Sequence, residues 1–202
     1  MKASEIQLPP LNSRLEEALI FAARLHAGQK RKGKDLPYIS HLLAVAALVF
    51  EAGGDGDEVI AALLHDAVED QGGVETLLEI RRRFGERVAM IVEGCSDSFS
   101  TPKPLWQERK ASYLIHLRSA PPEVRRVSLA DKLHNARTIL SDLEEHGDAT
   151  WSRFNGGRQG SLWYYQSLVE IFQESESGFM LREFTRVVQE IQRISGSGGS
   201  PV

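Results

Sequence analysis

"AALLHDAVED", residues 61–70, is an apolar run that acquires one histidine and three acids within six positions. On a helix, which advances about 100° per residue, His65, Asp66, Glu69 and Asp70 share an arc of roughly 140°. The remaining circumference is apolar, so protein should surround it and the polar arc should face an internal cleft. We therefore predict a buried helix over residues 57–70. A solvated acidic helix end is the alternative that this stretch alone leaves open.

Two other apolar segments carry polar residues that could join this cleft. Asp131 lies within VSLADKLHNARTIL, residues 127–140, where an unpartnered carboxylate would be costly to bury. His41 opens the apolar segment HLLAVA, which follows Pro37. With His65 and Asp66 they supply nitrogen and oxygen ligands from three helices, a set suited to Mn²⁺, Fe²⁺ or Zn²⁺. A divalent cation would also relieve the repulsion among the acids at the end of the helix.

Helical periodicity dominates the rest of the chain, and no run of alternating β-branched residues indicates a strand. The predicted fold class is all-α, a helical bundle, with residues 1–193 as one domain and 194–202 as a flexible C-terminal tail. Residues 98–106, rich in Ser, Thr and Pro, are predicted to form a loop. The predicted helices cover residues 15–26, 40–53, 57–70, 74–85, 86–97, 107–120, 123–147, 162–176 and 181–194.

The composition of the 202-residue chain is that of an ordinary globular protein, with 42% apolar and 26% charged residues. No stretch is apolar enough for a membrane span or a secretory signal, so we expect a cytoplasmic protein without membrane contacts. The single cysteine, Cys95, fits a reducing compartment. A formal net charge of -4 argues against binding to a nucleic acid polymer, although a local basic site for phosphates remains compatible with it.

The order His41, His65-Asp66, Asp131 resembles the H…HD…D signature of the HD phosphohydrolase superfamily. More narrowly, HAGQKRKGKDLPYISHLLAVA, ALLHDAVED and SLADKLHNAR are similar to the hydrolase domain of the RelA/SpoT family, and the chain length resembles that of stand-alone small alarmone hydrolases related to the metazoan SpoT homologue. The resemblance implies an HD-domain bundle in which those four residues ligate a metal, most often Mn²⁺. Zn²⁺ and Fe²⁺ are the alternatives.

The resemblance also implies roles for five further residues. Glu69 and Asp70 match the catalytic Glu-Asp pair that handles the attacking water, whereas Arg31, Lys32 and Asn135 match residues that contact the nucleotide. The implied reaction removes the 3′-pyrophosphate of guanosine tetra- or pentaphosphate and releases GDP or GTP. The substrate partner is therefore a guanosine nucleotide alarmone, and the sequence does not identify a protein partner.

Two other functions remain open at this point. A broader HD nucleotidase or an NADPH 2′-phosphatase would keep the metal site, and a non-catalytic HD module would sense a nucleotide without cleaving it. Helical phase predicts that Lys132 and His134 point away from the site, and the aromatic residues 163–165 are predicted to pack in the core.

Overall fold

The structure is a computed structural model that describes residues 13–97 and 104–197. The all-α prediction is confirmed: within these residues the chain forms helices, and the only β-type pairing is an isolated bridge between Lys30 and Pro37. The elements are α1 (Ser13–Leu25), α2 (Ile39–Glu51), α3 (Gly56–Leu64), α4 (Ala67–Asp70), α5 (Gly73–Phe84), α6 (Glu86–Cys95), α7 (Trp106–Ser119), α8 (Pro122–His146), the 3₁₀ helix η1 (Gly147–Arg153), α9 (Gly157–Ser175) and α10 (Phe179–Ser197).

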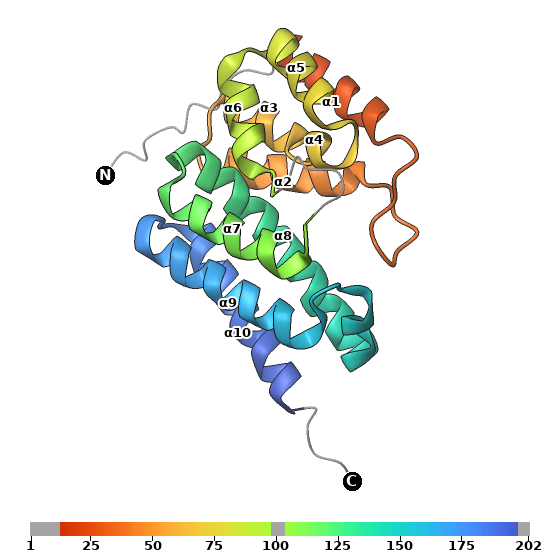
Figure 1. The fold of residues 1–202 in the computed structure, drawn as a ribbon, viewed down its shortest axis with the longest axis vertical. Coiled ribbons are helices and arrows are strands. Elements are labelled where there is room, and N and C mark those ends of the chain that lie inside the picture. The colour runs from red at the N-terminus through yellow and green to blue at the C-terminus, as the bar shows by residue number, and fades with distance from the viewer. Residues whose placement is uncertain (1–12, 98–103, 198–202) are drawn as a thin grey trace, which may run out of the picture.

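Helix α8 joins the two halves of the bundle. Figure 1 shows α1 to α6 gathered at one end and α7, α9 and α10 at the other, with α8 running between them. Its N-terminal half packs against α2, α3 and α6, and it also contacts α9, α10 and η1. A residue on α8 can therefore meet side chains from both halves of the chain.

Helix α3 lies at the centre of the first half, where every residue from Glu58 to Leu64 is buried. Its start is fixed by a capping box, in which the Asp55 carboxylate accepts from the backbone of the first turn and the Glu58 side chain accepts from the Asp55 N–H. The expectation of one continuous helix over 57–70 is wrong. A turn at His65 and Asp66 separates α3 from α4, and the ring of His65 bonds the carbonyl of Ala62. His65 and Asp66 keep right-handed helical backbone angles at this turn.

Helix α9 begins at Gly157, five residues before the predicted start, because the glycines in this region serve packing rather than a loop. A Cβ at Gly156 would lie 2.6 Å from the ring of Trp106, and one at Gly160 would lie 3.0 Å from it. The indole thus fits against α9 only where side chains are absent. Trp106 itself starts α7, and residues 98–103 of the predicted loop lie outside the described residues.

Helix α10 continues to Ser197, so the first residues of the predicted tail, 194–197, are helical. Ser195 is fully buried, and its backbone carbonyl accepts a bond from the Arg158 guanidinium. Residues 198–202 lie outside the described residues, and the single-domain assignment of residues 1–193 stays a prediction.

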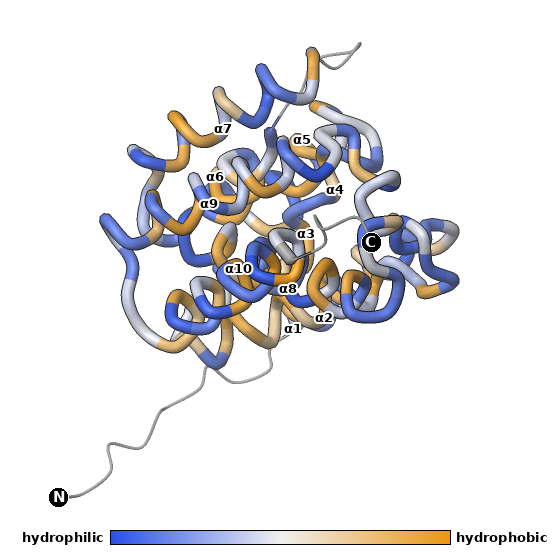
Figure 2. Tube along the Cα trace, turned by 90° about the horizontal axis from the view of Figure 1, so that it is seen from below, coloured by the Kyte–Doolittle hydropathy of each residue, from blue (hydrophilic) through white to orange (hydrophobic). Residues whose placement is uncertain are grey.

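The core runs through both halves of the bundle. Figure 2 shows hydrophobic and hydrophilic turns alternating along most helices, as expected where one face packs inward and the other meets solvent. The largest fully buried side chains include Phe172 and Phe184 in the second half and Leu42, Ile60 and Leu64 in the first. None of the described helices is long and apolar enough to span a bilayer.

Candidate functional site

Four side chains from three segments meet at one point in the bundle. His41 comes from the first turn of α2, His65 and Asp66 from the turn after α3, and Asp131 from α8. The Nε2 atom of His41 lies 3.2 Å from Asp131 Oδ1 and 3.5 Å from Asp66 Oδ2, and that of His65 lies 3.6 Å and 3.0 Å from the same two oxygens. The structure therefore brings together all four residues that the sequence predicted as metal ligands.

Both imidazoles are oriented through their second nitrogen. His65 Nδ1 lies 2.8 Å from the carbonyl of Ala62 and donates to it, whereas His41 Nδ1 lies 2.8 Å from Nδ1 of His134. Burial, followed by the charges of His41 and Arg31, lowers the pKa of His134 to about 4, so His134 is neutral and can accept this bond. The prediction that His134 points away is wrong, because α2 packs on the side of α8 that carries it.

The Nε2 atoms of His41 and His65 are buried, and the described part of the chain offers them no hydrogen-bond partner. An unpartnered buried nitrogen is costly, and each one faces carboxylate oxygens that can share a ligand with it. The donor set is two imidazole nitrogens and two carboxylates, which suits Mn²⁺, Fe²⁺ or Zn²⁺. The residues present thus fit a divalent metal ion.

The site also requires a positive charge. Burial alone raises the pKa of Asp66, but the charge of His65 and the nearness of both imidazole rings hold it well below its ordinary value. Burial alone lowers the pKa of His65, yet the negative charges of Asp66 and Asp131 beside its Nε2 atom raise it well above the ordinary value. Without a metal, the proton on His65 thus supplies the charge that a bound cation would bring.

The two carboxylates of the cluster have further hydrogen-bond partners. Tyr38 donates from its hydroxyl to Asp66 Oδ2 at 2.6 Å, and Lys132 lies 2.6 Å from Asp131 Oδ2. Asn135 donates to Asp131 Oδ1 at 2.5 Å. These bonds fix the orientation of both carboxylates, as partners around a metal site generally do.

Glu69 and Asp70 follow the cluster on the short helix α4. Asp70 is exposed and accepts a bond from Gln29 Nε2 at 2.7 Å. The side-chain amide oxygen of Gln29, Oε1, in turn lies 2.7 Å from Nδ1 of the buried His26. The same oxygen accepts a bond from Gln71 Nε2 at 2.6 Å. Glu69 lies 3.8 Å from the guanidinium of Arg109. The basic loop between α1 and α2 is thus tied to α4 through one glutamine.

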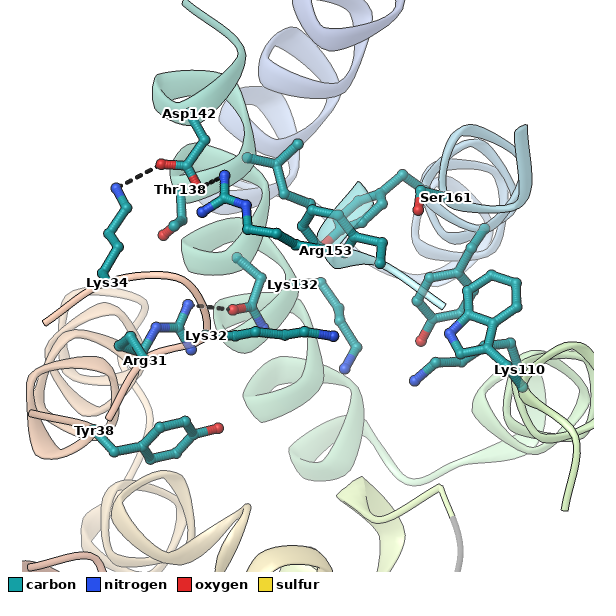
Figure 3. A pocket seen from close by; sticks show the side chains of 16 residues that line it. Arg31, Lys32, Lys34, Tyr38, Lys110, Lys132, Thr138, Asp142, Arg153 and Ser161 are labelled. Atoms are coloured by element: carbon teal, nitrogen blue, oxygen red, sulfur yellow. Dashed lines mark hydrogen bonds and ion pairs between the residues drawn. The ribbon is translucent and has the colours of Figure 1, made fainter. Parts of the chain in front are cut away.

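A pocket of about 310 Å³ opens beside the cluster, with several cationic side chains on its wall (Figure 3). Arg31 donates to Asn135 Oδ1 at 2.7 Å, so the basic loop closes on α8 at this point. Farther along the pocket, the buried Asp142 pairs with Lys34 at 2.7 Å and with Arg153 at 2.8 Å. The lining residues include Arg31, Lys32, Lys34, Tyr38, Trp106, Lys110, Lys132, Asn135, Thr138, Asp142, Arg153, Tyr164 and Tyr165.

Several of these residues were not expected from the sequence. Lys132 was predicted to point away, but its flexible four-carbon side chain reaches the pocket from the site helix. Tyr164 and Tyr165 are buried as predicted and also line the pocket, whereas Trp163 is 39% exposed and lies elsewhere. Gln29 could have been suspected only from its place beside the basic loop, since a lone glutamine carries no pattern.

Comparisons with known proteins give a family match and several relatives. The HD domain family model matches residues 18–162. A guanosine-3′,5′-bis(diphosphate) 3′-pyrophosphohydrolase of Xenopus tropicalis is 40% identical over 139 residues, which cover 67% of this chain and 73% of that protein.

Two further matches extend the comparison. The enzyme of the same activity name from Aquifex aeolicus is 40% identical over 131 residues, or 65% of this chain, and the matched part spans only 18% of the length of that relative. The solved structure of a metazoan orthologue of SpoT, described as hydrolysing ppGpp, superimposes with a TM-score of 0.70 over 95% of this chain and 98% of that one, at 22% identity. At that identity the likeness shows a shared fold.

Proposed function

The chain belongs to the HD-domain family, and from this membership we propose that it hydrolyses the 3′-pyrophosphate of guanosine tetra- or pentaphosphate, releasing pyrophosphate and GDP or GTP. The observation that carries the proposal is the convergence of two unpartnered imidazole nitrogens with two carboxylates beside a pocket rich in cations. The activity named for the Xenopus and Aquifex relatives selects the substrate.

His41, His65, Asp66 and Asp131 would hold the metal ion, which we propose to be Mn²⁺, with Zn²⁺ and Fe²⁺ as alternatives. When bound there, such an ion polarises a phosphoryl oxygen and lowers the pKa of a water molecule. Tyr38 and Lys132 support this role from outside the cluster. Lys132 holds Asp131 Oδ2 and leaves Oδ1 turned toward the imidazoles, whereas Tyr38 fixes Asp66 at Oδ2, the oxygen that faces them.

We propose that Glu69 and Asp70 orient the attacking water and accept its proton. Asp70 is exposed to solvent and accepts a bond from Gln29 at Oδ2, which orients its carboxylate on α4 next to the cluster. In the reaction, the water oxygen bonds to the phosphorus attached to the sugar O3′, and the P–O3′ bond breaks. The sugar oxygen gains a proton, and the released pyrophosphate carries the oxygen of the water.

Arg31, Lys32 and Asn135 are the proposed nucleotide contacts. All three line the pocket, and the bond from Arg31 to Asn135 joins the basic loop to the helix that carries Asp131. The planar guanidinium of Arg31, 5.6 Å from the centre of the Tyr38 ring, suits stacking on the guanine base. A substrate with two diphosphates needs such cations to offset its charge.

The test is a hydrolysis assay of the purified protein with Mn²⁺ on guanosine tetraphosphate, with NADPH and simple nucleotides in parallel and the products separated by anion exchange. We expect GDP and pyrophosphate from the alarmone. Cleavage only of NADPH or of ordinary nucleotides would replace this substrate with that of an HD nucleotidase or a 2′-phosphatase. Tight alarmone binding without any cleavage would replace the enzyme with a sensing module. The cytoplasmic location and the absence of a nucleic acid polymer partner stay predictions.

A further inference from the structure

Two lysines from different helices enter the pocket beside the metal cluster. Lys110 comes from α7 and Lys132 from α8, so they approach from two sides. Figure 3 shows their ammonium groups extending into the pocket, together with that of Lys32 from the basic loop. Lys132 follows Asp131 directly, so the lysine pair adjoins the proposed metal site.

Each of the two ammonium groups is held in place from behind. Lys110 Nζ lies 2.6 Å from the buried Asp97 and 5.0 Å from the centre of the Tyr164 ring. Lys132 Nζ lies 2.6 Å from Asp131. An ammonium group has three N–H donors, and the described residues supply one acceptor to each lysine. Two donors of each group are therefore left for a ligand in the pocket.

The local charge favours an anion. Lys110 and Lys132 are both largely buried, and burial followed by the charge of Lys132 lowers the pKa of Lys110. The charge of Lys132 acts on Lys110 although each ammonium group has a carboxylate partner, and a bound anion would offset this repulsion. The free N–H donors from two helices and the place of Lys132 next to Asp131 fit a phosphoryl group.

We propose that Lys110 and Lys132, with Lys32, form an anion subsite that holds the distal phosphoryl group of a pyrophosphate whose proximal phosphoryl group lies at the metal cluster. This inference rests on the proposed function. The subsite would let the enzyme distinguish a 3′-pyrophosphate from a 3′-monophosphate. A single phosphoryl group at the cluster leaves the remaining N–H donors of both lysines without an acceptor. A pyrophosphate reaches both sites.

The experiment titrates the metal-loaded full chain with inorganic pyrophosphate and, separately, with orthophosphate, by calorimetry at a fixed free Mn²⁺ concentration. Lys110→Met removes one ammonium group, and Arg109 remains to pair with Asp97. Lys110→Arg keeps the charge. Lys30→Met is the matched control, because Lys30 lies in the same basic loop as Lys32 but is exposed and does not line the pocket. Chelation of Mn²⁺ by pyrophosphate is identical in all titrations and cancels in the comparison.

We expect Lys110→Met to weaken pyrophosphate binding by about ten- to hundredfold, the usual cost of one charged hydrogen bond, and to leave orthophosphate binding nearly unchanged. Lys110→Arg should recover most of the affinity, and Lys30→Met should bind as the wild type does. Equal binding by Lys110→Met and the wild type would overturn the subsite, as would equal losses in Lys110→Met and Lys30→Met. A third titration uses GDP, which carries only the 5′-diphosphate; a loss confined to GDP would assign the lysines to the other end of the nucleotide and overturn the proposal too.

The titration does not depend on turnover, so it separates this inference from the proposed function. Pyrophosphate binding that requires Lys110, in a protein that never cleaves guanosine tetraphosphate, would keep the subsite and reject the substrate. Alarmone hydrolysis that is unchanged in Lys110→Met would keep the substrate and reject the subsite.

Discussion

Replacing Gln29 with alanine should lower kcat for guanosine tetraphosphate about tenfold while leaving Mn²⁺ content and KM close to those of the wild type. Gln29 Nε2 donates to Asp70 Oδ2 at 2.7 Å, and this bond holds the carboxylate that we assign to the water. A hydrogen bond to a charged group contributes about 1.5–3 kcal/mol, and we take the lower end because Asp70 is exposed. About 1.4 kcal/mol corresponds to a factor of ten in rate.

The assay measures kcat, KM and bound Mn²⁺ for Gln29→Ala and for Gln71→Ala. Gln71 donates to the side-chain oxygen Oε1 of Gln29 at 2.6 Å, whereas Asp70 is held by Nε2 of Gln29. The Gln71→Ala variant should therefore lose much less activity. Equal losses in both variants would refute the reasoning, because Asp70 would then not be the group through which Gln29 acts. A raised KM at unchanged kcat would also refute it, by assigning Gln29 to anchoring of the basic loop alone.

Three further predictions follow from the same geometry. Asp70→Asn should keep its Mn²⁺ and lose hydrolysis, whereas His65→Ala should lose both; elemental analysis with the activity assay would expose a wrong assignment if the Asp70 variant lost its metal. Metal binding at pH 7 should release about one proton, because the pKa of His65 is raised in the metal-free protein and a ligand nitrogen must be deprotonated. Metal affinity should therefore rise with pH. Calorimetry in buffers of different ionisation enthalpy measures the released protons, and release of none would contradict the prediction. Leu64→Ala should lower the free energy of unfolding by about 2–5 kcal/mol in urea titrations, because Leu64 is fully buried at the end of α3; a loss below about 1 kcal/mol would show that the site collapses around the smaller side chain.

The sequence predicted the all-α class and the ligand cluster because both depend on short-range order. His65 and Asp66 are adjacent, and the apolar run before them fixes a buried position whether or not the helix continues. Asp131 stands out for a similar reason, since a carboxylate amid apolar residues needs a partner. His41 joined the set only through the order and spacing of the whole pattern.

The rest of the site depends on contacts that single-sequence patterns do not carry. Gln29 and Tyr38 are neutral residues of an irregular loop, and their bonds to Asp70 and Asp66 arise from how that loop folds back over α4. Lys132 and His134 were misplaced because helical phase gives the direction of a Cβ, whereas a long side chain or a neighbouring helix decides where its polar end lies. The subsite lysine on α7, Lys110, comes close only through tertiary packing.

The same limit explains the helix boundaries. The break between α3 and α4 occurs where the His65 ring donates a hydrogen bond to the backbone carbonyl of Ala62. Helix propensities do not include side-chain bonds of this kind. The extension of α10 to Ser197 follows from burial against α9, where Arg158 reaches the carbonyl of Ser195. A segment rich in serine and glycine predicts a flexible chain, because the sequence does not reveal a tertiary contact such as that of Arg158.

The most direct test of the central claim is hydrolysis of guanosine tetraphosphate in ¹⁸O-labelled water by metal-stripped protein to which Mn²⁺ is returned stepwise. We predict no turnover without metal, full activity near one Mn²⁺ per chain, and the ¹⁸O label in the released pyrophosphate rather than in GDP. Activity that is indifferent to metal, or label in the sugar hydroxyl of GDP, would contradict it.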